Sequence, residues 1–234
     1  VMPTYNEREN IELLVQRLKD VLQGIRWEII FVDDDSPDGT ADIIRSIASK
    51  NAQVRCIHRI GRRGLASACV EGMMSSSSEY LAVMDADLQH DEQLLTTMFD
   101  RLKSKNLDIV IGSRYIDGSG IKNWEKRRLF MSKLATTLSH MIIKSDIKDP
   151  MSGFFMLRRC LLIKVVRGLT GRGFKILLDI LASARGNITY EEVPFTFKDR
   201  SFGESKLDML VTLDYLVMLI DKSIGHLIPV YFIM

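Results

Sequence analysis

The first 112 residues alternate short apolar runs with amphipathic segments, and this alternation constrains the fold more than any other feature of the chain. Residues 27–32 form a short, bounded apolar run, which is typical of a buried strand. Residues 7–22 place their apolar side chains at helical spacing. The alternation predicts an α/β fold with a mainly parallel sheet flanked by helices on both faces. Further strands are expected at 54–58, 80–84 and 108–112, and further helices at 40–49, 64–77 and 91–103.

The pattern changes after residue 112. We expect a loop at 113–123, then a long and partly apolar helix at 124–144. A turn at 149–153 leads into a strand expected at 154–157. The elements expected beyond it are helices at 160–167 and 174–184, a strand at 189–197 and a polar loop at 198–206. Residues 1–206 are therefore expected to form one domain.

The tail, residues 207–234, begins with a strongly apolar segment that contains Asp208 and Asp214. Each of these charges would be costly at the middle of a bilayer, so residues 207–220 form a poor membrane span. We expect an amphipathic helix on a membrane interface, and a helix packed on the preceding domain is the open alternative. Residues 224–234 are too short to cross a bilayer but resemble the start of a span. Because residue 1 continues a strand and the last residues are apolar, we expect a piece of a longer protein.

Composition excludes some classes of partner. A chain of 234 residues with a formal charge of +2 has no global basic excess, so we expect no nucleic-acid partner. Three widely spaced cysteines form neither a zinc pattern nor a disulfide framework, which is typical of a reducing compartment. No G-x-G-x-x-G follows the first strand, and this excludes a dinucleotide-binding dehydrogenase.

Two carboxylates follow the strand expected at residues 80–84. Asp85 and Asp87 stand one residue apart at the carboxyl end of that strand, which is the edge where open α/β sheets bind ligands. Two carboxylates held close repel each other unless a cation lies between them, and oxygen ligands suit Mg²⁺ or Mn²⁺. The alternative is a solvated turn in which Asp91 caps the next helix. This motif alone does not decide between the two interpretations.

Polar groups also follow the first two strands. Residues 3–7 (PTYNE) precede a helix, where they can meet a ligand or simply cap the helix and complement its dipole. Asp33, Asp34 and Asp35 follow the second strand. Three adjacent acids cannot all be stabilised by capping one helix, so we expect at least one to accept hydrogen bonds from a base or a ribose. Three strands thus end in polar clusters on one sheet edge, a pattern more specific than any single motif.

With these motifs the chain resembles the family 2 glycosyltransferases of the GT-A fold, and within them the dolichyl-phosphate mannose synthases and related polyprenyl-phosphate sugar transferases. The matching motifs are collinear and cover nearly the whole chain. They are PTYNE (3–7), DDDSPDGT (33–40), GLASA (64–68), MDADLQH (84–90), GSRY (112–115), DPMSGFF (149–155) and RSFGESKL (200–207). Two departures concern loop geometry: Ala66 stands where glycine is usual, and Glu92 stands where proline is usual.

The resemblance implies a GT-A catalytic domain at 1–206, with 207–234 as the membrane-associated tail. The residues implied to line the nucleoside pocket are Pro3, Tyr5, Glu7, Val32 and Asp34. Those implied to face the diphosphate are Asp85, Ala86 and Asp87, and the implied ligands of Mg²⁺ or Mn²⁺ are Asp85, Asp87 and Gln89. Arg114 would approach the sugar or the phosphates, Arg128 and Ser132 would lie near the acceptor phosphate, and a mobile loop would bring in Arg200 and Lys206. The expected catalytic residues are Asp87, Arg114, Arg200 and Lys206.

The implied reaction is metal-dependent, inverting transfer of a sugar, mannose from GDP-mannose being favoured, to dolichyl or another polyprenyl phosphate. A phosphate monoester has a second pKa near ~6, so the acceptor is already largely ionised and needs no strong general base. The implied partners are a nucleotide-sugar donor, the lipid phosphate and a membrane surface at the cytoplasmic face, with a possible membrane-anchoring segment or subunit.

Two alternatives stay open. A UDP-sugar transferase of the same fold, with a glucose or aminosugar donor, would share these motifs. A non-catalytic nucleotide-sugar-binding domain is the other, although such a module would not need to keep Asp85, Asp87, Arg200 and Lys206.

Overall fold

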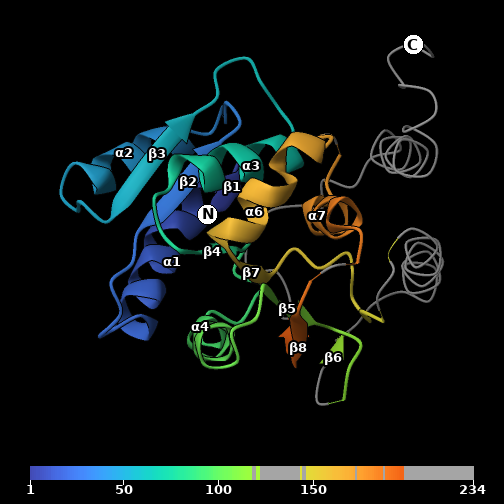
Figure 1. Cartoon of the computed structure of the whole chain (residues 1–234). Helices are drawn as coiled ribbons and strands as arrows, with labels where there is room; N and C mark the ends of the chain where they lie inside the picture. Colours follow the sequence, from blue (N-terminus) through green and yellow to red (C-terminus); the bar gives the residue numbers. More distant parts are fainter. Residues whose placement is uncertain (118–119, 122–142, 144–145, 172, 187, 198–234) are drawn as a thin grey trace, which may run out of the picture.

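Three parallel strands form the first part of the sheet in the computed structural model, which describes residues 1–117, 120–121, 143, 146–171, 173–186 and 188–197 (Figure 1). They are β1 (Met2–Thr4), β2 (Ile29–Asp33) and β3 (Val54–His58), paired in the order β1-β2-β3. The register sets Asp33 beside both Thr4 and His58, so the polar carboxyl ends of these strands are neighbours. The connecting helices are α1 (Arg8–Val21) and α2 (Thr40–Ala48).

A second group of strands contains one antiparallel member. Its order is β4-β7-β5-β8, with bounds Tyr80–Val83, Phe155–Arg158, Ile109–Ser113 and Tyr190–Pro194. β5 and β8 are parallel, whereas β7 runs antiparallel to both β4 and β5. The Val1 amino group donates to the Ala82 carbonyl at 2.8 Å, and the Met84 amide donates to the Val1 carbonyl at 3.2 Å. These bonds join β1 to β4 and place the two groups edge to edge.

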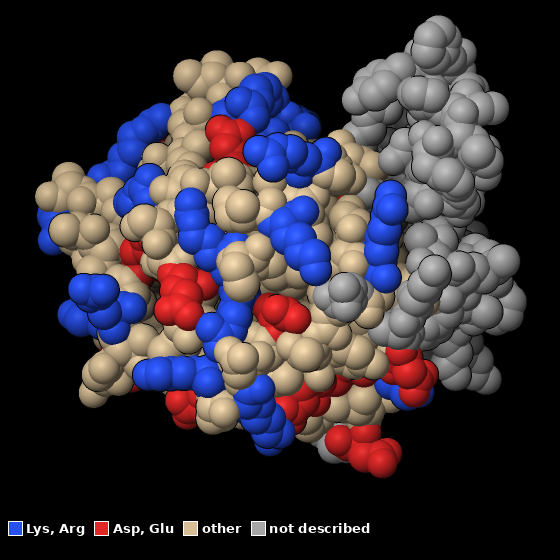
Figure 2. All heavy atoms as spheres, viewed as in Figure 1, with Lys and Arg blue, Asp and Glu red and all other residues tan. Residues whose placement is uncertain are grey.

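Helices cover both faces of this sheet, as Figure 1 shows. One hydrophobic cluster joins the strands to α3 (Leu65–Ser75), α6 (Arg159–Val165) and α7 (Ile176–Ala184). Another joins them to α1, α2 and α4 (Leu94–Ser104). The α/β prediction with helices on both faces is therefore confirmed. Lys and Arg side chains are interspersed with Asp and Glu on the face drawn in Figure 2.

Most predicted elements are present, with shifted ends. The helix predicted at 91–103 begins only at Leu94, because Asp91 and Glu92 form a turn whose carbonyls accept the Leu94 and Leu95 amides at 3.0 and 3.2 Å. The loop predicted at 113–123 contains β6 (Gly120–Ile121), and the strand predicted at 189–197 is divided into β8 and β9 (Thr196–Phe197). β6 and β9 pair in parallel. A 3₁₀ turn, η1 (Val166–Gly168), follows α6.

Some predictions fall on residues that the structure does not describe. These are the helix at 124–144, the loop at 198–206, the domain boundary at 206 and the tail at 207–234. Within the described part of the chain, every helix is too short or too polar to span a membrane.

Candidate functional site

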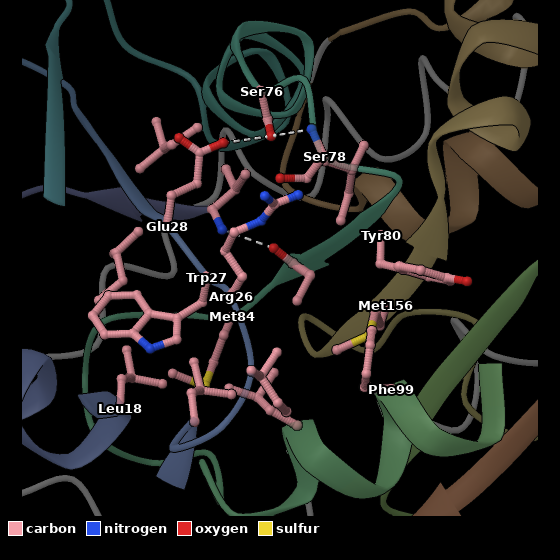
Figure 3. A pocket seen from close by; sticks show the side chains of 18 of the residues that line it. Leu18, Arg26, Trp27, Glu28, Ser76, Ser78, Tyr80, Met84, Phe99 and Met156 are labelled. Atoms are coloured by element: carbon pink, nitrogen blue, oxygen red, sulfur yellow. Dashed lines mark hydrogen bonds between the residues drawn. The ribbon is translucent and has the colours of Figure 1, made fainter. Parts of the chain in front are cut away.

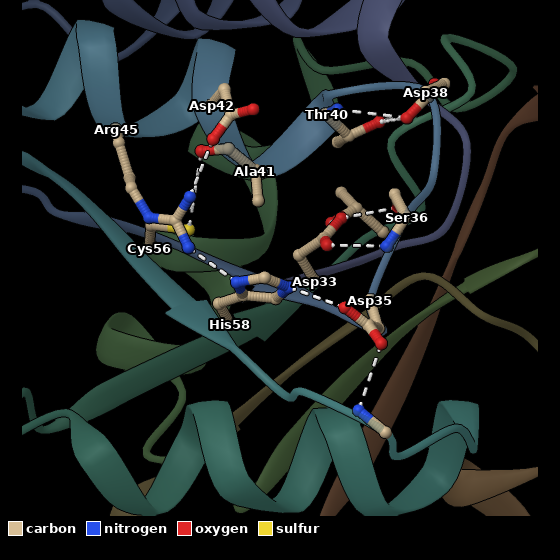
Figure 4. A network of polar contacts seen from close by, with 12 residues as sticks. Asp33, Asp35, Ser36, Asp38, Thr40, Ala41, Asp42, Arg45, Cys56 and His58 are labelled. Carbon is tan, nitrogen blue, oxygen red and sulfur yellow. Dashed lines mark hydrogen bonds and ion pairs between the residues drawn. The ribbon is translucent and has the colours of Figure 1, made fainter.

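The acidic run after β2 is held largely by partners within the chain. Asp33 accepts hydrogen bonds from the Thr4 hydroxyl at 3.1 Å and from the Ser36 amide and hydroxyl at 3.0 and 2.6 Å (Figure 4). Asp35 accepts from the His58 ring at 3.0 Å and from the Gly61 amide at 3.0 Å. These two carboxylates fix the turn after β2 and tie it to β1 and β3. Neither therefore requires a nucleotide to explain its presence.

Asp34 is the carboxylate of this run that was assigned to the nucleoside pocket. Its oxygens accept from the Arg59 guanidinium at 2.8 Å and from the Gly64 amide at 2.7 Å. Burial raises the pKa of Asp34, and the Gly64 hydrogen bond and the Arg59 charge only partly oppose that rise. All three acids thus have partners within the chain, and the contact of one of them with a base or a ribose stays a prediction. The role of Asp34 stays a prediction.

Arg59 is a residue that the motifs missed. It is 4 % exposed, and it also donates to the Ser67 hydroxyl at 2.6 Å and so connects β2 to α3. No sequence signal marks it, because it lies in a short loop far from Asp34 along the chain. Arg63 from the same loop lies 4.2 Å from the centre of the Tyr5 ring, which places a second cation at this end of the site.

The remaining residues assigned to the nucleoside and diphosphate differ in exposure. Pro3 and Tyr5 are half-buried. Glu7 precedes α1, and its carboxylate accepts a hydrogen bond from the side-chain amide of Asn10 at 2.7 Å. Val32 is 0 % exposed and Ala86 is 2 % exposed, each within a hydrophobic cluster. These two side chains therefore support the floor of the site and offer no open surface to a ligand in this structure.

The loop after β4 folds back on itself, with Asp85 half-buried and Asp87 buried. Leu88 adopts a left-handed conformation with φ of 61°, and the Gln89 amide donates to the Asp87 carboxylate at 3.1 Å. The Asp85 amide donates to Nδ1 of His90 at 3.3 Å. These bonds close a tight turn over residues 85–90, which contains Asp85, Asp87 and Gln89.

His90 anchors this loop from inside the protein. Its ring stacks on Phe154 with centres 5.1 Å apart and meets the edge of Phe195 at 5.5 Å. Burial lowers the pKa of His90 to about 4, so the ring is neutral at pH 7. Because Nδ1 accepts the Asp85 amide, we assign the proton to Nε2. The residue stood within the quoted MDADLQH motif, and that was the signal that could have identified it.

Arg114 follows β5 and is clamped by a buried carboxylate. Its Nε and Nη2 donate to the two oxygens of Asp149 at 2.7 and 2.8 Å, and its backbone amide donates to Asp149 at 3.1 Å. Burial opposes the Arg114 charge, but the Asp149 hydrogen bonds and charge outweigh it and raise the pKa of the guanidinium. Glu192 on β8 accepts the amides of Lys148 and Asp149 at 2.8 and 3.0 Å and so fixes the loop that carries Asp149.

A cavity of about 140 Å³ lies beside these groups. It brings Asp85 and Arg114, which were predicted, together with residues that were not. Gly153 lies so near Asp85 that a Cβ added there would be 3.1 Å from Oδ2. The lining residues are Leu65, Val83, Asp85, His90, Arg114, Met151, Gly153, Phe174, Lys175 and Ile176.

A larger cavity of about 500 Å³ lies at the opposite end of the strands, where β2 and β4 begin (Figure 3). One of its charged residues, Glu28, already accepts hydrogen bonds from Ser76 at 2.7 Å and from Arg55 at 3.1 Å. Of the predicted site residues that the structure describes, none lines it. Open α/β sheets bind their ligands at the carboxyl ends of the strands, so we place the site at the smaller cavity.

The described residues contain no cluster of three or more His, Cys, Asp or Glu side chains arranged to hold a metal. The predicted set of Asp85, Asp87 and Gln89 has only two such side chains, because its third member is an amide. Mg²⁺ is often held by one or two carboxylates together with substrate phosphates, and this donor set fits that mode. Four other predicted residues, Arg128, Ser132, Arg200 and Lys206, lie outside the described residues.

Comparison with known proteins agrees with this architecture. The model of the family "Glycosyl transferase family 2" matches residues 1–166. The chain is 43 % identical to a dolichol-phosphate mannosyltransferase of Pyrococcus furiosus over 220 residues, which cover 92 % of this chain and 60 % of the relative. It is 36 % identical to a dolichol-phosphate mannosyltransferase of Saccharomyces cerevisiae over 228 residues, or 94 % and 84 % of the two chains.

A solved structure shares the fold at low sequence identity. It is the glucosyl-3-phosphoglycerate synthase of Mycobacterium tuberculosis in complex with Mn²⁺, UDP-glucose and phosphoglyceric acid, with a TM-score of 0.65 and 20 % identity. The match covers 94 % of this chain and 77 % of that one. This likeness confirms the predicted fold class.

Proposed function

The chain belongs to glycosyl transferase family 2, and we propose that it transfers mannose from GDP-mannose to the phosphate of a dolichol or another polyprenol. The observation that carries the proposal is its identity of 43 % and 36 % with two dolichol-phosphate mannosyltransferases over more than nine-tenths of its length. The chain spans 60 % of the archaeal relative, so that protein's full activity is transferred here as a proposal only.

The donor would lie along the carboxyl edge of the sheet. Tyr5, Glu7 and Asp34 at the ends of β1 and β2 would meet the nucleoside, and the Asp85–Asp87 turn would meet the diphosphate. Asp85, Asp87 and Gln89 would hold Mg²⁺ or Mn²⁺, which supplies electrostatic stabilisation of the leaving nucleoside diphosphate when bound. The Mn²⁺ bound by the mycobacterial neighbour of the same fold supports this assignment.

Arg114 is the described cation best placed to act on the donor. Asp149 accepts hydrogen bonds from Nε and Nη2 of the guanidinium and so holds the Arg114 side chain in one orientation, in the wall of the cavity that Asp85 also lines. A preorganised donor of this kind stabilises charge that develops in the transition state without reorganising. Arg114 would therefore contact a donor phosphate or sugar oxygen as the glycosidic bond breaks.

The acceptor phosphate would attack without a general base, because it is already largely ionised at neutral pH. His90 is buried and neutral, and its Nδ1 is engaged by the Asp85 amide, which suits a structural role. Attack in one in-line displacement would invert the anomeric centre and give a β-linked product from an α-linked donor. Arg128, Ser132, Arg200 and Lys206 are proposed to bind the acceptor phosphate and close the site.

The lipid acceptor implies action at a membrane surface. We assign the protein to the cytoplasmic face, with residues 207–234 as the membrane-associated segment. A UDP-sugar donor is the second candidate, and the UDP-glucose bound by the mycobacterial neighbour keeps it open.

The test is a transfer assay with purified protein, Mn²⁺, a polyprenyl phosphate and a panel of radiolabelled nucleotide sugars. We expect label from GDP-mannose to enter the organic phase only when the lipid phosphate is present. Asp87→Ala should abolish this label, whereas Asp20→Ala on the exposed side of α1 should not. Label from a UDP-sugar instead would replace the donor assignment, and no label from any donor would contradict the proposal.

A further inference from the structure

The cavity beside Asp85 and Arg114 is also lined by Lys175, a charged residue that lies outside the family motifs. Its polar lining combines the carboxylate of Asp85, which accepts hydrogen bonds, with Arg114 and Lys175, which donate them. The rest of the wall is apolar and includes Leu65, Val83 and other aliphatic and aromatic side chains. Such a mixture suits a ligand that both donates and accepts hydrogen bonds and has an apolar face.

The size of the cavity narrows the choice further. At about 140 Å³ it is well below the roughly 300–1,000 Å³ of pockets that enclose whole drug-sized ligands, so it fits one small unit of a nucleotide sugar. Because the diphosphate is proposed to lie at the Asp85–Asp87 turn, the unit of the donor left for the cavity is the sugar. A hexose ring would donate hydroxyl hydrogens to Asp85, accept hydrogen bonds from Arg114 and Lys175 and pack its carbon face against the aliphatic side chains.

Lys175 is held in the cavity wall by rigid neighbours. The Ala66 amide at the start of α3 donates to the Gly173 carbonyl at 3.1 Å and so fixes the turn that precedes Lys175. On the following helix α7, buried Asp179 accepts from the Thr170 amide and hydroxyl, each at 2.8 Å. The Lys175 ammonium also lies 4.3 Å from the centre of the Phe174 ring. A side chain supported in this way can discriminate the geometry of a ligand.

We propose that Lys175 donates a hydrogen bond to one hydroxyl group of a donor hexose bound in this cavity, which makes it a specificity-determining residue. The inference rests on the proposed glycosyl transfer and adds to it a residue that lies outside every matched motif. Lys175 donates to a hydroxyl oxygen, while Asp85 accepts from a hydroxyl on the same ring. A sugar that lacks the hydroxyl read by Lys175 makes one hydrogen bond fewer to this half-buried side chain.

The test is a double-substitution cycle between protein and donor. Wild type and Lys175→Met are compared with GDP-mannose and with its 2-, 3-, 4- and 6-deoxy analogues, by equilibrium binding and by kcat/KM of transfer. Lys175→Met keeps the length and apolar packing of the side chain. Lys19→Met, at an exposed position on α1, is the matched control.

We expect Lys175→Met to lower kcat/KM for GDP-mannose by roughly 10- to 100-fold, the usual range for a hydrogen bond to a charged group. With the wild type, kcat/KM for one deoxy analogue should be lower than for GDP-mannose by a similar factor. With Lys175→Met, kcat/KM for that analogue and for GDP-mannose should be almost equal. The affinity for GDP alone should be unchanged, which a collapsed site would not allow. Lys19→Met should behave as wild type.

The outcomes separate this inference from the proposed function. One outcome is that the wild type transfers mannose while the loss from Lys175→Met is the same for GDP-mannose and for every deoxy analogue. In that case the inference is wrong and the function stands. If the coupling appears in donor binding but no sugar reaches the lipid, the subsite is supported and the function is wrong. A wild-type protein that binds no nucleotide hexose contradicts both.

Discussion

Replacing Asp149 should separate the stability of the protein from its activity. The Asp149 carboxylate is 0 % exposed and accepts three hydrogen bonds from Arg114, whose side chain is 12 % exposed. Asp149→Leu leaves a mostly buried guanidinium without its carboxylate, which costs about 3 kcal/mol or more of unfolding free energy. The Arg114 backbone amide also loses its acceptor, which adds about 1 kcal/mol. The expected loss is therefore about 4 kcal/mol.

The double variant Arg114→Met/Asp149→Leu removes both charges together. Replacing a buried ion pair by apolar side chains is often close to neutral, so only the cost of the backbone amide, about 1 kcal/mol, should remain. The double variant should thus be more stable than Asp149→Leu by about 3 kcal/mol. Urea unfolding followed by tryptophan fluorescence measures both values.

Activity should follow the opposite logic. Both variants lack a correctly held Arg114, so each should lose at least about 100-fold in kcat/KM, equivalent to about 2.7 kcal/mol of transition-state stabilisation. Recovery of stability without recovery of activity is the expected signature. A double variant as unstable as the single one, or an Asp149→Leu enzyme with nearly full activity, would refute the reasoning that Asp149 positions Arg114.

Substitutions of Gly153, His90 and Arg59 test other contacts of the site. Gly153→Ala would bring a Cβ to 3.1 Å from Asp85 Oδ2, so the Mn²⁺ concentration needed for half-maximal activity should rise several-fold; Gly168→Ala, whose Cβ would meet only Ser183 at 3.7 Å, should leave it unchanged. Because the folded pKa of His90 is about 4 against an ordinary value of 6.5, its contribution to stability should be present above pH 6.5 and be lost as pH falls toward 4. Unfolding titrations should show His90→Asn with a smaller loss over that range, and an unchanged slope would contradict the burial argument. Arg59→Met should leave the Asp34 carboxylate without its guanidinium partner and lower the free energy of unfolding by about 3 kcal/mol. Adding Asp34→Leu to that variant should restore most of the lost stability.

The strands of the sheet were predicted best where the residues of the strand itself carry the pattern. β2 is largely an apolar run, β3 has fewer apolar residues, and both lie within two residues of their predicted places. The antiparallel direction of β7 was not predicted, because strand direction depends on the path of the chain between β5 and β7. The loop and the helix that the sequence predicts at 113–144 do not specify the direction in which the chain returns to the sheet.

The site was predicted in its outline but not in its internal chemistry. Asp85 and Arg114, both predicted site residues, line one cavity, and the roles predicted for them stay predictions. The partners that decide their orientation, His90 and Asp149, lay in quoted motifs without an assigned role. The partners of the acids after β2 were not predicted from the sequence, because the Arg59 that pairs with Asp34 is 25 residues away along the chain.

Product analysis tests the central claim most directly. Purified protein is incubated with Mn²⁺, a polyprenyl phosphate and GDP-mannose labelled with ¹³C at the anomeric carbon, and the organic-phase product is examined by NMR. The account predicts a mannose whose anomeric carbon is coupled to the lipid phosphorus, in the β configuration. An α-linked product would contradict the single displacement, and labelled mannose found only as free sugar would contradict transfer to the lipid phosphate.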